Sequence, residues 1–260
     1  MFSKEHIEFI KKKKRRKRFI LIVQLLILFS FIIVWQLLAD FNLINSFLFS
    51  SPKSIYDTLI KLSKTNLFDH IFITFYETII SFLIASIVGF FIASLLWLNK
   101  TFAEIIDPYL TVINSLPKVA LGPLIIIWVG ASINSIIVMA LMISLILSII
   151  NIYNGFLSTD DNYILLLKSF KASKFKIFIK VVIPSNLKNI FNSLKINISM
   201  SLIGVIMGEL LVSKKGLGYL IMYGSQVFNI NLIITSVFIL GILSYIIYYI
   251  LMIIEKHFFK

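Results

Sequence analysis

The sequence contains no cysteine, which excludes disulfide bonds and thiolate metal ligands. Its three histidines, His6, His70 and His257, are scattered and lack the spacing of metal ligands. The dipeptide Gly-Lys does not occur, so a Walker A loop for nucleotide phosphates is impossible. Paired carboxylates and a nucleophile elbow are also missing. We therefore expect no catalytic residue, no metal and no cofactor on this chain, and any ATP that drives it must bind to another chain.

Acidic residues are scarce as well, with 12 Asp and Glu against 25 Lys and Arg, for a net charge of +13. Hydrophobic residues make up 59% of the chain and the mean hydropathy is +0.97, whereas soluble domains are roughly 45–50% apolar. The apolar residues form blocks of about twenty, the length that a helix needs to cross a bilayer. The basic residues lie at the block ends, which indicates contact with lipid and not with nucleic acid.

The pattern predicts an all-α integral membrane protein with about six transmembrane helices. A basic cytoplasmic segment, residues 1–18, precedes a single transmembrane domain, residues 19–260. The expected spans are 19–39, 71–98, 108–129, 134–156, 191–212 and 230–254. Small and polar residues recur at helical spacing within them, as in the pair Gly204 and Gly208, and we interpret these as close contacts between helices of the same chain.

The distribution of Lys and Arg predicts the orientation. With the N-terminus inside the cell, 19 of the 25 basic residues lie on the cytoplasmic side, five lie outside, and Lys118 lies within a span. Short cytoplasmic loops carry an excess of Lys and Arg. We therefore expect a multi-pass protein of the cell membrane with both termini in the cytoplasm.

The long cytoplasmic segment 157–190 contains an amphipathic pattern. Apolar residues at Phe175, Phe178, Ile179 and Val182 follow the i, i+3, i+4, i+7 spacing of one helix face, and Pro184 ends the pattern. Lysines occupy the opposite face. Such a helix either docks on a protein partner or lies on anionic lipid.

This segment resembles the coupling loop, or EAA loop, of permease subunits of ABC importers. Pro184 aligns with the proline that ends that motif, and Ala172, Ser173 and Lys174 match the residues after its glycine. Two positions depart from it: Leu165 begins the stretch where Glu-Ala-Ala is usual, and Lys171 replaces the glycine. Since glycine tolerates a positive φ and lysine does not, we expect either a strained or a different turn at Lys171.

Further motifs are similar to the nitrate, sulfonate and taurine permease family, which also includes importers of thiamine precursors and riboflavin. The matching stretches are 48–52, 114–124, 128–130, 208–210 and 216–221. The resemblance implies a permease that pairs with a second permease chain, two cytoplasmic ATPase subunits and an extracytoplasmic substrate-binding protein. The solute would be small and polar or anionic. The alternative function is an ATP-independent channel or secondary carrier, which would have no need of an ATPase-docking loop.

Lys118 lies eleven residues after Asp107, about 16 Å along a helix, and so close to the middle of a core about 30 Å thick. A lysine at that depth costs about 2.5–3.5 kcal/mol and usually faces a partner or a water-filled cavity. Together with Asn114, Ser115 and Glu209, Lys118 is a candidate residue of the translocation path. In the alternative interpretation Lys118 is structural, paired with Glu77 or Glu209 or extended to the interface.

Overall fold

The computed structural model describes residues 4–259, and their side chains from residue 12 on, as a bundle of helices without strands. Residues 1–3 of the predicted N-terminal segment and Lys260 lie outside the described residues. The helices long and apolar enough to cross a membrane are residues 12–40 of α1 (Lys4–Asp40), α4 (Leu67–Leu98), α7 (Ile133–Leu157), α11 (Leu187–Val212) and α13 (Ile230–Phe258). A bent helix pair brings the number of candidate spans to as many as six, which agrees with the predicted all-α membrane fold.

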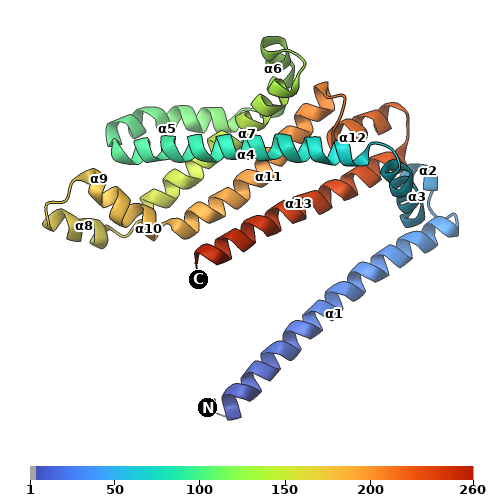
Figure 1. The fold of residues 1–260 in the computed structure, drawn as a ribbon, viewed down its shortest axis with the longest axis horizontal. Coiled ribbons are helices and arrows are strands. Elements are labelled where there is room, and N and C mark those ends of the chain that lie inside the picture. Colours follow the sequence, from blue (N-terminus) through green and yellow to red (C-terminus); the bar gives the residue numbers. More distant parts are fainter. Residues whose placement is uncertain (1–3, 260) are drawn as a thin grey trace.

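The third predicted span is broken. Helix α5 (Lys100–Ser115) ends before Pro117, and the short 3-10 helix η1 (Lys118–Leu121) and helix α6 (Gly122–Val129) continue at an angle of 84° to it. The break has a local cause, because a residue before proline avoids the helical conformation, and Leu116 is extended with ψ 141°. Figure 1 shows α6 projecting from the bundle. The residues left between the predicted spans 71–98 and 108–129 are helical too, since α5 begins at Lys100.

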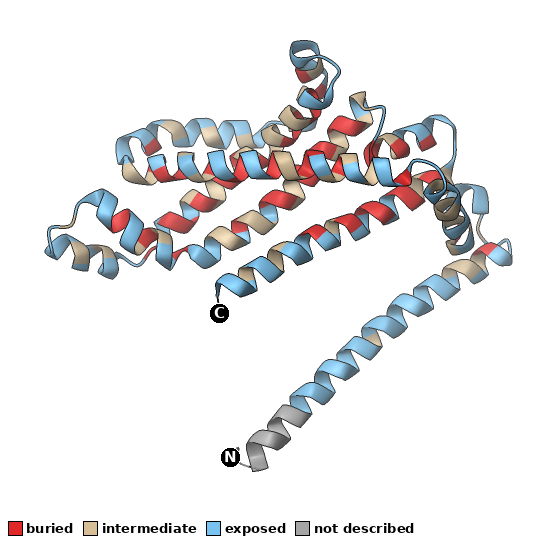
Figure 2. Ribbon diagram, viewed as in Figure 1, coloured by how far each residue is buried: buried red, intermediate tan, exposed pale blue. Residues whose placement is uncertain are grey.

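Helix α7 packs against both α4 and α11, and the close approach depends on small side chains. A Cβ atom on Gly204 would overlap the backbone of Ala140, and one on Gly208 would lie 2.9 Å from the Cα atom of Ile136. Both glycines therefore face α7 of the same chain, as the spacing predicted. Figure 2 shows the buried residues concentrated where these helices meet.

Shorter helices connect the spans. They are α2 (Ser46–Phe49), α3 (Pro52–Ser63), α8 (Asp161–Ser169), α9 (Lys174–Ile177), the π-helix η2 (Phe178–Val182), α10 (Ile183–Ser185) and α12 (Leu217–Gln226). Residues 213–229, between the last two predicted spans, thus contain a helix, α12, which packs on α13 and α11. Helix α3 packs against α13 at the periphery of the bundle.

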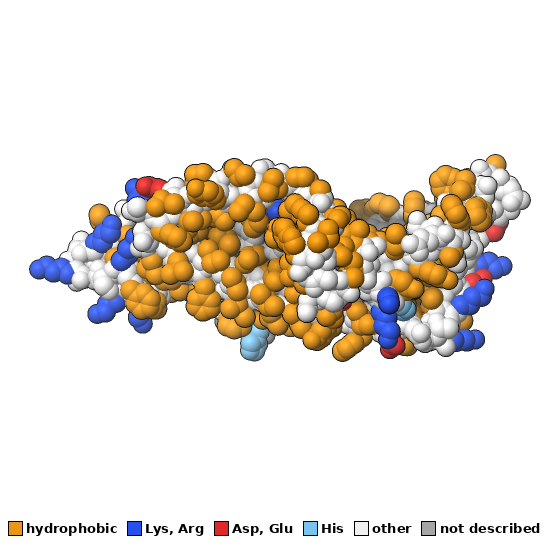
Figure 3. Space-filling view, turned by 90° about the horizontal axis from the view of Figure 1, so that it is seen from above, with side chains coloured by type: hydrophobic (Ala, Val, Ile, Leu, Met, Phe, Trp, Pro, Cys, Tyr) orange, Lys and Arg blue, Asp and Glu red, His pale blue; other side chains and the backbone are white. Residues whose placement is uncertain are grey.

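Helix α1 diverges from the other spans and approaches the bundle only near its C-terminal end (Figure 1). There the backbone N–H of Lys53, in α3, donates to the side-chain oxygen of Gln36 at 3.0 Å. None of the apolar stretch of α1 is buried. Figure 3 shows hydrophobic side chains over the middle of one face of the molecule and Lys and Arg toward its two ends. This distribution suits a bundle whose middle lies in hydrocarbon.

Candidate functional site

The segment between α7 and α11, residues 158–186, forms a compact structure that we call the connector. The predicted amphipathic helix does occur there, but not as one regular helix. It consists of α9, one turn of π-helix (η2) and α10, and Pro184 lies in the first turn of α10. Short π-helical segments are frequent at functional sites. The connector is therefore more irregular than its sequence pattern predicts.

Lys171 adopts the left-handed conformation, with φ 56°. It follows the last turn of α8, where its N–H donates to the carbonyl of Lys168 at 2.8 Å and the N–H of Ala172 donates to the carbonyl of Leu167 at 3.0 Å. These two bonds define a Schellman motif, whose left-handed position is usually glycine. The turn thus keeps a glycine-type shape although it carries a lysine, at a cost of roughly 1–2 kcal/mol.

The apolar face of the connector is divided between the inside and the outside of the molecule. Phe178 and Val182 are buried, whereas the Phe175 side chain is 60% exposed and that of Ile179 is 43% exposed. The Phe178 ring lies 5.2 Å from the ring of Trp97 at the end of α4. Within the described chain Phe178 and Val182 therefore attach the connector to its own bundle, and of the predicted apolar face only Phe175 and Ile179 are left exposed.

The remaining predicted connector residues cap and orient it. The Ser173 hydroxyl accepts from the N–H of Lys176 at 3.3 Å and begins α9. The Lys174 ammonium lies 5.6 Å from the centre of the Trp97 ring, within the range of a cation–π contact. At the base of the connector, the Asn186 amide donates to the Thr159 hydroxyl at 2.7 Å, which ties the start of α11 to the end of α7.

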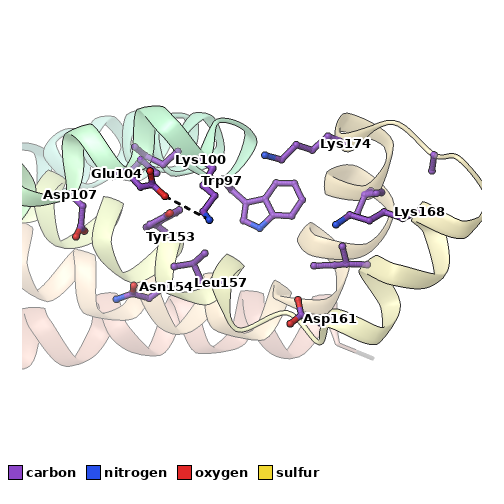
Figure 4. A pocket seen from close by; sticks show the side chains of 15 residues that line it. Trp97, Lys100, Glu104, Asp107, Tyr153, Asn154, Leu157, Asp161, Lys168 and Lys174 are labelled. Carbon is purple, nitrogen blue, oxygen red and sulfur yellow. Dashed lines mark ion pairs between the residues drawn. The ribbon is translucent and has the colours of Figure 1, made fainter.

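A cavity of about 870 Å³ lies between the connector, the end of α7 and the corner where α4 turns into α5. Figure 4 shows Lys168 and Lys174 on one side of it, Lys100 and Glu104 on the other, and the Trp97 indole between them. Charged side chains of both signs line it, including an ion pair of Lys100 with Glu104 at 3.7 Å. Such a lining needs water, so this end of the bundle lies outside the hydrocarbon core.

The structure brings three of the four predicted path residues together at the break in the third span. The Lys118 ammonium donates to the carbonyl and to the side-chain oxygen of Asn114, at 3.0 and 3.1 Å. Ser115 is exposed beside them, and its hydroxyl donates to the Val112 carbonyl. No ion pair among the described residues joins Lys118 to Glu77 or Glu209. Because the chain bends here, the rise along α5 does not give the depth of Lys118, which remains a prediction.

Glu209 lies apart from this group, buried in α11 with 1% of its surface exposed. Its two carboxylate oxygens accept from the Thr74 hydroxyl of α4 and from the N–H of Gly218 at the start of α12, both at 2.6 Å. The sequence showed Gly208-Glu209-Leu210 and the glycines at 216 and 218 only as motifs. The structure shows why they belong together, since a Cβ atom on either Gly216 or Gly218 would overlap the Glu209 carboxylate.

Sequence reasoning did not identify the partners of Glu209. Thr74 also accepts from the N–H of Leu217 at 2.8 Å, and His70 accepts from the N–H of Gly216 at 2.9 Å. Polar residues at positions 70, 74 and 77 of an otherwise apolar span recur at helical spacing, and this signal could have indicated a buried polar contact. The fold and these sites define a multi-span helical membrane protein with an amphipathic connector fixed to one end of its bundle.

The sequence of this chain is similar to those of known membrane transport proteins. Residues 85–260 match the model of the binding-protein-dependent transport system inner membrane component. The chain is 27% identical over 187 residues to the formylaminopyrimidine transport permease ThiX of Halalkalibacterium halodurans, covering 72% of this chain and 74% of that protein. It is 20% identical over 218 residues to the taurine transport system permease TauC of Escherichia coli, covering 82% and 79%.

The fold is also similar to a chain of the MetNI methionine ABC transporter in an inward-facing conformation. The TM-score is 0.66 and the identity 20%, with 74% of this chain and 95% of that chain covered. The chain therefore belongs to the family of binding-protein-dependent transport system inner membrane components. It is a permease subunit of an ABC importer and spans the membrane several times.

Proposed function

We propose that this permease pairs with a second copy of itself and that two cytoplasmic ATPase subunits drive the pair. The observation that carries the proposal is the divided face of the connector. Phe178 and Val182 hold it to the bundle, while Phe175 and Ile179 remain exposed beside lysines, with nothing in the described chain to cover them. Exposed apolar side chains on a charged surface are typical of an interface with another protein.

The test is retention of the ATPase by the purified permease. Phe175→Asp would place a charge in the proposed contact without disturbing the packing of Phe178, so we expect the ATPase subunit to be lost during affinity purification. Leu43→Asp is the control, because Leu43 is 71% exposed in the turn that follows α1, away from the connector. Equal recovery of the ATPase with Phe175→Asp and with wild type would contradict the docking role.

The same proposal requires the connector, and with it both termini, to face the cytoplasm. This orientation rests on the 19 basic residues on one side against five on the other and on the charged cavity at the connector end. A reporter active only outside the cytoplasm, fused after Lys260, should stay inactive. Activity of that fusion would exclude the orientation.

The solute that we propose is small and polar or anionic, delivered by an extracytoplasmic binding protein. The transport proteins to which the chain is similar are named for taurine and for formylaminopyrimidine. Lys118, at the break of the third span, forms no ion pair within the described part of the chain, and its charge would favour an anionic or electron-rich group. A ligand screen on the partner binding protein tests the class, because substrate is first selected there.

An ATP-independent channel or carrier was the alternative from the sequence. Such a protein would leave the attached connector and its exposed apolar residues without a role. Membership in a binding-protein-dependent family also favours the ATP-driven importer.

A further inference from the structure

Two carboxyl groups meet in the interior of the bundle, at the end opposite the connector. Glu77 of α4 and Glu209 of α11 are each 1% exposed. Glu209 accepts from the hydroxyl of Thr74, which precedes Glu77 by one turn of α4, so the two carboxyl groups lie on the same side of α4, where it packs against α11. Glu77 lies ten residues into α4, about 15 Å along the helix. Two bare carboxylates in contact at such a place would repel each other and lose their hydration.

No cation compensates the pair within the described residues. Helix α7 contains no charged residue at all, and those of α13 lie near its far end, from Glu255 on. The ion pairs present involve neither glutamate. The other titratable or charged groups on these elements are tyrosines, one histidine, one aspartate and four lysines: Asp69, His70 and Tyr76 of α4, Tyr153 of α7, Lys188 and Lys195 of α11, Lys214 and Lys215 of the turn before α12, Tyr219 and Tyr223 of α12, and Tyr245, Tyr248 and Tyr249 of α13. His70 is engaged with the N–H of Gly216 and stacks on Tyr219.

The hydrogen bonds distinguish the two glutamates. Glu209 accepts from the Thr74 hydroxyl and from the N–H of Gly218, and it lies at the N-terminus of α12, where the helix dipole stabilises a negative charge. Glu77 receives no such donors, and its Oε2 atom is buried without any hydrogen-bond partner. A hydrogen bond between two carboxyl groups requires a proton on one of them.

We propose that Glu77 and Glu209 form a proton-binding site in which Glu77 is the carboxylic acid and donates its proton to the carboxylate of Glu209. The single remaining charge then holds the turn 213–216 and the start of α12 against α4 and α11. The site binds one proton and no metal ion. This inference is independent of the ATPase and solute assignments, since it concerns only the interior of the bundle.

Infrared spectroscopy of the complex in lipid nanodiscs tests the proposal. The wild-type spectrum at neutral pH should contain the carbonyl band of a protonated carboxylic acid that the Glu77→Gln spectrum lacks. Glu104→Gln is the matched control, because Glu104 is exposed and should not contribute to that band. A wild-type minus Glu77→Gln difference spectrum without this band would overturn the proposal.

Thermal unfolding separates the roles of the two residues. Gln at position 77 supplies an N–H donor of the same shape, so Glu77→Gln should assemble and melt as wild type does. Gln at position 209 would direct an N–H group at a donor, so Glu209→Gln should melt at a clearly lower temperature. Failure of Glu77→Gln to assemble contradicts the proposal. So does a wild-type melting temperature that falls when sodium and potassium are replaced by a large organic cation, since that result indicates a bound metal ion.

Discussion

The ring of Phe178, in the connector, packs edge-on against the ring of Phe156 at the end of α7, with ring centroids 5.2 Å apart and an interplanar angle of 86°. The ring of Trp97, in α4, also contacts the ring of Phe178. One aromatic residue thus joins the connector to two membrane helices. We expect a movement imposed on the connector to be transmitted to α4 and α7, because close-packed interiors have low compressibility and transmit strain.

Phe178→Ala is expected to destabilise the permease itself. Removing a buried phenylalanine costs about 3–5 kcal/mol, through lost burial and the cavity that remains. Phe175→Ala is the matched control on the same helix face, and its exposed side chain should contribute little to folding. The measurement is thermal unfolding of the purified permease without the ATPase. Equal melting temperatures for the two variants would show that Phe178 does not anchor the connector.

Lys171→Gly should stabilise the connector. Glycine adopts φ 56° without the steric cost that lysine pays, so the gain is about 1 kcal/mol. Lys168→Gly, in the last turn of α8, is the control and should instead cost up to about 1 kcal/mol, because glycine weakens a helix. Limited proteolysis of the connector measures both effects. Faster cleavage of Lys171→Gly than of wild type would contradict the predicted relief of strain.

Gly204→Ala should prevent tight packing of α11 on α7, since the new Cβ atom would overlap the backbone of Ala140. Gly241→Ala in α13 is the matched control, because nothing lies within 4 Å of the position of its Cβ atom. We expect Gly204→Ala to reduce the amount of folded protein in the membrane and Gly241→Ala to leave it unchanged or slightly increased. A wild-type yield and a wild-type melting temperature for Gly204→Ala would show that α11 and α7 can move apart without a loss of stability.

Lys118→Met tests the role of the lysine in the broken span. Its side chain contacts only Asn114 among the hydrogen-bonding residues, so the methionine variant should assemble normally. If Lys118 borders the path, uptake of an anionic solute should fall while ATPase activity in the complex persists. Lys53→Met, at the start of α3, is the control. Unchanged uptake with normal assembly would exclude the path role, and failed assembly would favour a structural one.

About six apolar spans could be predicted from the sequence alone, because the length of an apolar block and the placement of lysines reflect the bilayer and do not depend on which helices are neighbours. The glycine contacts could be predicted as well, since small residues at helical spacing are typical of close helix packing, and the break before Pro117 follows a local rule for the residue that precedes proline. Even the unusual turn at Lys171 was visible as a lysine at a glycine position.

Which side chains of the connector are buried against the bundle depends on the tertiary packing. Phe175 and Phe178 are identical in type and lie on the same face of the pattern, yet one is exposed and the other is buried against Phe156 and Trp97. The periodicity of apolar residues defines one face of a helix, but it does not show which residues of that face pack against the rest of the protein. The hydrogen bond between Thr74 and Glu209 likewise joins residues 135 positions apart in the sequence, and the spacing within each helix does not show which helix faces pack together. That choice depends on how α4, α7 and α11 pack together.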